Sequence, residues 1–394
     1  MEKIKQTKRA EEERSVVEEA ARDKDVAIKP IYIPEDIALL EQVGALEILL
    51  KDHSTGGNIV WATGGYALQG LEFEAQHQIQ IEQITGDNAQ NIRKRAQKAK
   101  DEKSVLTRKH AEVFTPTWIC KYMIDEADAA WMEDVGYGNS ANDWKKYVES
   151  PRLEITCGEA PYLVNRYDAE TGEPVAIEKR IGMLDRKLQK ITESTKTRQT
   201  WIKWAKVALQ SIYGYEFQGD NLLIARVNSL MDINEHIVAA GYKGLTKEEW
   251  LELADVVSWN LWQMDGLTKC VPFGKPKPEN VQLSLFDDLF SEQKDDDGRG
   301  FALVRNWESN EDIEFGCITR RGKQMKFDYI IGNPPYQEEQ EGDNATFAPP
   351  VYDKFMDGAY AVSDKVELIT PARFLFNAGS TPKAWNKKCL MIPI

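Results

Sequence analysis

The sequence predicts an α/β protein with a doubly wound, mostly parallel sheet and helices on both of its faces. From about residue 150 onward, short apolar segments rich in β-branched and aromatic residues recur along the 394-residue chain. Longer segments between them repeat their apolar residues at helical spacing. Since neighbouring parallel strands need a crossover, which is usually a helix, this alternation indicates a parallel sheet.

Five strands and the helices between them account for the pattern. Two helical segments, 220–240 and 247–257, separate the second strand from the third. Two insertions are expected to interrupt the sheet, a helical and basic one at about 166–210 and a second at about 271–323. The expected strands are 153–156, 212–217, 259–264, 327–332 and 365–369.

The chain divides into two expected regions. Residues 1–110 should form a mainly helical and basic N-terminal region, because the stretch 37–50 repeats apolar residues at helical spacing. A segment rich in Gly and aromatic residues follows at 54–70. Residues 111–394 should form the domain that holds the sheet.

The bulk composition excludes several classes of protein. With 42% hydrophobic and 29% charged residues the chain is globular. Its charged N-terminus and the absence of a long apolar run predict a cytoplasmic protein without membrane spans. An odd number of scattered cysteines, without a CxxC pair, predicts neither a disulfide framework nor a metal site. The five cysteines are Cys120, Cys157, Cys270, Cys317 and Cys389.

The distribution of charge matters more than the net value of −14. Residues 91–110 hold eight Lys or Arg against two acids, and residues 178–206 hold nine against three. After Pro371 only basic charges remain. Each run alone is typical of a solvated helix face, but three such runs in an acidic chain leave a DNA-facing surface open as an interpretation.

Candidate ligand-binding residues follow the expected strands. Open parallel sheets bind ligands beyond the carboxyl ends of their strands. Glu154, at the first strand, could accept hydrogen bonds from an amine, and Gly158 could let the backbone approach a ligand closely. Glu216, at the second, suits a ribose diol, and Asp265, after the third and before Gly266, suits an adenine amine.

The most specific pattern follows the fourth strand and reads Asn333-Pro334-Pro335-Tyr336. Two prolines remove two backbone donors and stiffen the loop, so that it presents carbonyl oxygens and the Asn333 amide in a set arrangement. The Asn333 side-chain oxygen and the Pro334 carbonyl could accept both hydrogens of a planar amine, while Tyr336 offers a face for stacking. A proline-rich turn with a core aromatic is the ordinary alternative, but the position after a strand favours a catalytic loop.

Taken in order, these motifs resemble those of adenine-specific (N6) DNA methyltransferases of bacterial restriction-modification systems. The resemblance covers about residues 58–388. It implies a Rossmann-like methyltransferase sheet that binds S-adenosyl-L-methionine, with the loop 333–336 as its catalytic loop. It also places Phe114, Thr115 and Pro116 at the methionine end of the cofactor pocket.

The resemblance assigns the remaining cofactor residues and reveals one departure. The family's acidic residue and the loop after it correspond to residues 154–160, which include Cys157 and Gly158. Glu159 and Ala160 stand where the family has serine and a second glycine, and the family's proline is missing, so the cofactor loop is expected to be shaped differently or weakened. Glu216 matches the ribose-binding acid, and Asp265 with Gly266 matches the adenine-contacting position.

The resemblance implies direct methyl transfer to the N6 amine of an adenine that is rotated out of double-stranded DNA, without a metal. A separate specificity or endonuclease polypeptide could accompany such a modification enzyme, and the family's C-terminal target-recognition domain is expected to be absent. Other enzymes with this loop methylate a glutamine amide, a guanine amine of ribosomal RNA or the N4 amine of cytosine. An inactive methyltransferase fragment is a further alternative.

Overall fold

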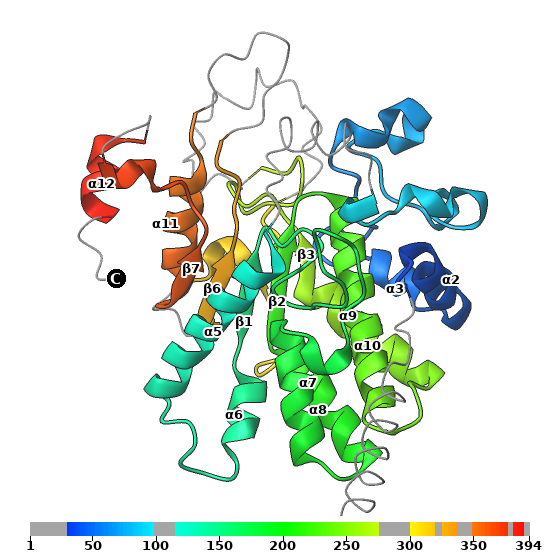
Figure 1. The fold of residues 1–394 in the computed structure, drawn as a ribbon. Coiled ribbons are helices and arrows are strands. Elements are labelled where there is room, and N and C mark those ends of the chain that lie inside the picture. The colour runs from blue at the N-terminus through cyan, green and yellow to red at the C-terminus, as the bar shows by residue number, and fades with distance from the viewer. Residues whose placement is uncertain are drawn as a thin grey trace, which may run out of the picture.

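The computed structural model describes residues 30–97, 115–275, 300–319, 325–337, 349–376 and 381–389. Five strands form one sheet in which every neighbouring pair is parallel. This confirms the predicted α/β fold (Figure 1). In spatial order the strands are β3 (Leu261–Gln263), β2 (Ile212–Glu216), β1 (Arg152–Ile155), β6 (Tyr329–Gly332) and β7 (Val366–Leu368).

The strand order places β1 at the centre of the sheet. The chain moves outward from β1 through β2 to β3, and then crosses to β6 and β7 on the other side of β1. This reversal makes a topological switch point beside β1, which is where open sheets form a crevice for ligands. All five expected strands are present, but the third begins at Leu261, two residues later than expected, because α10 (Lys247–Asn260) continues three residues beyond its expected end.

The first face of the sheet is covered by helices that share one large core with it. The strand residues that this core buries are Ile212, Leu261, Tyr329 and Ile331. The helices are α5 (Thr117–Asp134), α6 (Asp143–Glu149), α7 (Met183–Ser194), α8 (Arg198–Gln210), α9 (Gly219–Ala239) and α10.

The second face is covered by α11 (Tyr352–Val362) and by a hairpin of β4 (Leu303–Asn306) and β5 (Glu311–Glu314). Leu153 and Ile330 point into this second core, together with Phe355 of α11. Because β1, β2, β3 and β6 are buried on both faces, most of their residues are apolar. The short helices η8 (Phe315–Cys317), η9 (Ala372–Phe376) and α12 (Lys383–Cys389) complete this part of the chain.

The segment 166–210 is a crossover rather than an appendage. Its two helices, α7 and α8, connect β1 to β2, and Leu188 and Trp201 are fully buried in the main core. Six of its ten Lys and Arg residues form ion pairs with acids, which neutralises part of its positive charge. The interpretation of the run 178–206 as a DNA-facing surface stays a prediction. The paired residues are Arg166, Arg180, Arg186, Lys190, Arg198 and Lys206.

Residues 30–97 are the described part of the predicted N-terminal region, and only their first part forms α-helices; residues 1–29 and 98–110 lie outside the described residues. Residues 33–50 form α2 (Ile33–Val43) and α3 (Leu46–Leu50), which lie beside α10 at the edge of the molecule (Figure 1). Residues 51–97 instead fold into turns and short 3-10 helices, because closely spaced glycines interrupt the pattern. The short helices are η1 (Gly64–Gln69), η2 (Leu71–Phe73), η3 (Ile81–Gln83), η4 (Gly86–Asn91) and η5 (Arg95–Gln97).

This region packs tightly against the sheet domain. A Cβ atom at Gly219, the first residue of α9, would overlap the carbonyl oxygen of Val60. The Gln263 amide binds both the N–H and the carbonyl of Val60, each at 2.8 Å. The two predicted regions therefore share one core, and their division at residue 110 stays a prediction. Among the described helices, none has the length and apolar character needed to cross a membrane.

Candidate functional site

A cavity of about 360 Å³ opens at the carboxyl ends of β1, β2, β3 and β6. Pro116, Pro334 and Tyr336 are not part of its wall, although each neighbours a residue that is. Phe114 lies outside the described residues. The predicted site residues that line the cavity are Thr115, Glu154, Cys157, Gly158, Glu216, Asp265, Gly266, Asn333 and Pro335.

The loop after β1 bends sharply into the cavity. Thr156, Gly158 and Ala160 have φ values of +46°, +55° and +62°. This left-handed conformation costs a residue with a side chain roughly 1–2 kcal/mol. Ala160 thus adopts a left-handed conformation, which accounts for the glycine that the family has at this position. The change from glycine to alanine leaves the loop bent. A Cβ atom at Gly158 would meet nothing within 4 Å, so the backbone is open to a ligand there.

Two buried acids hold this loop in place. The N–H of Gly158 donates to Glu216 Oε2 at 2.8 Å, and the N–H of Gln218 donates to Oε1 at 3.0 Å. The N–H of Leu163 donates to Glu154 Oε2 at 3.0 Å. Burial, together with the nearby charge of Glu216, raises the pKa of Glu154 well above its ordinary value. A cation in the cavity would favour the ionised form of this carboxyl.

The end of β3 contributes an acid and a glycine. Leu267 donates its N–H to Asp265 Oδ1 at 2.8 Å, which orients the carboxylate at the cavity wall. A Cβ atom at Gly266 would overlap the Phe355 ring and lie 3.0 Å from the Tyr215 ring. Glycine at 266 therefore allows α11 to close over this end of the cavity.

The Asn333 carboxamide is held from both sides. Its Nδ2 donates to Thr115 Oγ1 at 3.1 Å, and the Tyr336 hydroxyl donates to its Oδ1 at 3.0 Å. In this orientation Oδ1 is the acceptor end of the amide and Nδ2 is the donor end. Tyr336 is partly buried against a small cluster that contains Tyr352 and Phe374. The structure thus joins the predicted motif at 115 to the predicted catalytic loop.

The cavity wall also contains residues that were not predicted as part of the site. Arg95 comes from the N-terminal region, Glu159 and Tyr167 follow β1, and Val351 and Phe355 belong to the region of α11. No local pattern in the sequence identified which residues of α11 face the cavity. Arg95 was seen only as one member of a basic run.

Cys157 lines the cavity without being reactive. Burial, with the nearby charges of Glu154 and Glu216, raises the pKa of its thiol well above the ordinary value. The thiol form is a poor nucleophile. Cys157 therefore has a structural role in the loop after β1.

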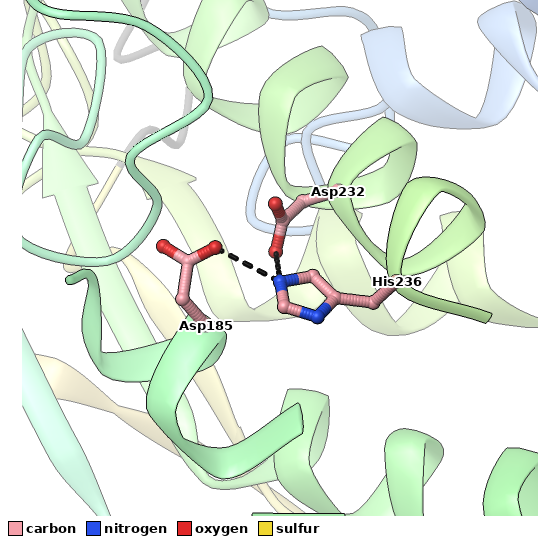
Figure 2. Close-up of side chains that lie close together, drawn as sticks. All are labelled: Asp185, Asp232 and His236. Atoms are coloured by element: carbon pink, nitrogen blue, oxygen red, sulfur yellow. Dashed lines mark hydrogen bonds and ion pairs between the residues drawn. The ribbon is translucent and has the colours of Figure 1, made fainter. Parts of the chain in front are cut away.

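Away from the cavity, a buried charge cluster joins α7 to α9. Figure 2 shows that the His236 ring lies between the carboxylates of Asp185 and Asp232. His236 Nε2 is 3.1 Å from Asp185 Oδ1 and 3.7 Å from Asp232 Oδ2. The three ligand atoms lie within 4.8 Å of one another, a spacing that could hold a metal ion.

The partners of this cluster indicate ion pairing instead. Arg180 Nη1 lies 2.5 Å from Asp232 Oδ1, and Asp185 accepts hydrogen bonds from two backbone N–H groups, those of Gly182 and Asn165. Burial alone would lower the pKa of His236, but the charges of Asp232 and Asp185 raise it. Burial raises the pKa of Asp232 to about 7. His236 Nε2 thus pairs with both carboxylates directly, whereas a metal ion would have to stand between the three side chains.

Comparison with protein families gives one match. Residues 210–391 match the family described as "Eco57I restriction-modification methylase". The matched segment runs from the end of α8 through β2, β3 and the loop 333–336 to α12. It supports a restriction-modification methylase family for this chain. No curated protein and no solved structure gives a significant match.

Proposed function

We propose that this protein transfers a methyl group from S-adenosyl-L-methionine to the N6 amine of adenine in DNA, as the modification part of a restriction-modification system. The observation that carries the proposal is the position of Asn333. Its carboxamide stands at the cavity wall beside Thr115, at the end of β6. The family match over residues 210–391 supports a DNA methyltransferase.

The order of the acids across the sheet fits the proposed cofactor. Asp265 at β3 suits the adenine amine, Glu216 at β2 the ribose diol, and Glu154 at β1 the cationic amino acid portion. Asn333 at β6 then lies where the acceptor must enter. The bound cofactor would supply an activated methyl group on a sulfonium centre, and buried carboxylates favour such a cation.

The catalytic loop would act on the substrate amine. The Asn333 Oδ1 atom and the Pro334 carbonyl accept its two hydrogens, which directs the nitrogen lone pair toward the methyl donor. The Thr115 hydroxyl keeps Oδ1 turned toward the substrate by holding Nδ2. An adenine inside a duplex cannot reach this position, so the base is extruded, and the Tyr336 ring offers a stacking face.

A labelling experiment tests the reaction and its substrate class. The chain is incubated with tritium-labelled cofactor and, separately, with mixed genomic DNA, ribosomal RNA or a release factor. We expect label in DNA, recovered as N6-methyladenine after nuclease digestion. If the label is found in RNA or protein, or in DNA as N4-methylcytosine, the loop acts on a different amine and the proposed N6-adenine activity is wrong.

A pair of variants tests the residue roles. Asn333→Ala should reduce methyl transfer by about 100-fold or more, since it removes an acceptor at the reacting amine. Its cofactor affinity should stay near that of the wild type. Asn139→Ala is the matched control, because Asn139 is exposed and bonds only locally to Gly136. Equal activity of the two variants would contradict the proposal.

A further inference from the structure

Part of the cavity wall comes from the N-terminal region, which is hydrogen-bonded through Lys94 and Arg95 to the chain that follows β1. The backbone N–H of Arg95 donates to Glu159 Oε1 at 2.5 Å, across 64 residues of sequence. The other oxygen of Glu159 accepts the Tyr167 hydroxyl at 2.7 Å. Lys94 donates to the carbonyl of Gly172 at 2.9 Å, and its ammonium lies 4.4 Å from the Tyr167 ring centre.

These contacts hold Arg95 at a cavity whose charged lining residues are mostly acids. The carboxylates of Glu154, Glu159 and Glu216, with that of Asp265, line the described wall. Only two cations, both arginines, line that same described part. Arg95 is one of them, and its backbone N–H is bonded to Glu159 Oε1, which fixes this part of the wall.

The second cation, Arg166, is committed to the protein interior. Its guanidinium donates to Asp36 at 2.8 Å, to Asn228 at 3.0 Å and to Glu235 at 2.5 Å. The residue is 2% exposed. A guanidinium with these partners stabilises the junction of α2 and α9 and is not positioned to reach into the cavity.

The chemistry of the proposed cofactor requires a cation at one end. Its sulfonium and ammonium groups suit the acids, but its carboxylate would be repelled by them. Because Glu216 and Asp265 take the adenosine portion at β2 and β3, the amino acid portion lies toward the loop after β1, where Glu159 holds Arg95. We propose that Arg95 binds the carboxylate of the cofactor's amino acid portion, an inference that rests on the proposed function.

The inference gives the N-terminal region a direct role in cofactor binding. The same contact explains the departure at Glu159, where the family has a serine. A carboxylate at this position accepts both the Arg95 N–H and the Tyr167 hydroxyl.

Two ligands that differ only in the amino acid portion show whether Arg95 binds the carboxylate or affects ligand binding in general. Calorimetry on the full chain compares S-adenosylhomocysteine with 5′-methylthioadenosine, which lacks the carboxylate and the amine. Arg95→Gln should weaken binding of the first ligand by about 10- to 100-fold, the range for a charge-assisted hydrogen bond. Binding of the second ligand should be unchanged.

Two further variants calibrate the comparison. Asp265→Asn should weaken both ligands, because both contain adenine. Lys121→Gln, a change at an exposed cation of α5, should weaken neither. Equal losses for both ligands in Arg95→Gln, or no loss for either, would overturn the role of Arg95. Failure of the wild type to bind either ligand would instead overturn the proposed function and this inference with it.

Discussion

The molecule buries carboxylates in two places whose surroundings differ. In the buried charge cluster, Asp232 faces the guanidinium of Arg180 and the imidazole of His236. In the cavity, the partners shown for Glu154 and Glu216 are backbone N–H groups, and about 360 Å³ of open space lies beside them.

The difference separates a structural arrangement from a binding site. Removing a carboxylate from water costs several kcal/mol unless a cation or hydrogen-bond donors compensate. The cluster obtains its cations from the chain itself, so it stabilises the contact between α7 and α9. The cavity leaves room for a cation from outside, as a sulfonium ligand would supply. Substitutions in the cluster should therefore change stability, and substitutions in the cavity should change binding.

The largest expected effect is on stability. His236→Leu leaves Asp185 and Asp232 buried without the shared imidazole, so the free energy of unfolding should fall by about 3–5 kcal/mol. Cofactor affinity should not change. Urea unfolding followed by circular dichroism measures the first quantity and calorimetry the second. Lys121→Ala, which breaks an exposed pair, should cost less than about 1 kcal/mol. A similarly small loss in His236→Leu would erase the distinction between the two regions.

The next effect is on binding. Glu216→Ala removes the acceptor assigned to the ribose diol and two hydrogen bonds that shape the loop. Affinity for S-adenosylmethionine should fall about 10- to 100-fold, and stability should fall by less than in His236→Leu. Glu216→Gln keeps one acceptor oxygen and should lose less. Unchanged affinity in the alanine variant, measured by calorimetry, would remove Glu216 from the cofactor site.

The third effect concerns pH. The folded state raises the pKa of Asp232 from 3.8 to about 7 and also raises that of His236 above 6.5. The folded protein thus holds protons that the unfolded chain releases, and this proton binding stabilises the folded state. The contribution of Asp232 is complete below about pH 4. It is lost as pH rises through about 7, and the His236 contribution is lost above pH 6.5. The slope approaches about 1.4 kcal/mol per pH unit for each proton.

Urea unfolding from pH 5 to pH 8 measures this slope. Asp232→Asn should flatten the decline, because it removes the acid whose protonation is linked to folding. Glu216→Asn, in the cavity, should leave the Asp232-linked part in place. Parallel pH profiles for the wild type and Asp232→Asn would show that the cluster does not titrate with folding.

The smallest effect is expected at the catalytic loop. Tyr336→Phe removes the hydroxyl that donates to Asn333 Oδ1 at 3.0 Å but keeps the ring. Losing one hydrogen bond of this kind costs about 0.5–1.5 kcal/mol, so kcat for DNA methylation should fall only several-fold. Steady-state methyl transfer gives the value. A loss as large as that of Asn333→Ala would give the phenol itself a role at the reacting amine.

Much of the fold could be predicted from local pattern. The five strands lie where β-branched and aromatic segments predicted them, with the third displaced by the extra turn of α10. That displacement was not predictable from residues 259–260 alone, because Trp259 stacks on His53 at 3.8 Å and the Asn260 amide binds the carbonyls of Leu209 and Ile212. These contacts come from other parts of the chain.

The basic run shows most clearly what could not be predicted from local pattern. The basic run at 178–206 has the composition of a solvated, DNA-facing helix, yet Arg180 and Arg186 are paired with acids of α5 and α9. A run of like charges in sequence does not reveal the opposite charges that the fold brings to it.

By itself, the sequence determined the alternation of strands and helices and the acids at the strand ends, because these depend on the identity and spacing of nearby residues. The loop 333–336 was recognisable for the same reason. Only the tertiary structure decided that Thr115 would hold Asn333, that Arg95 would meet Glu159, and that His236 would lie between two acids. Each of these contacts joins residues far apart in the chain, and such contacts form only when the whole core packs.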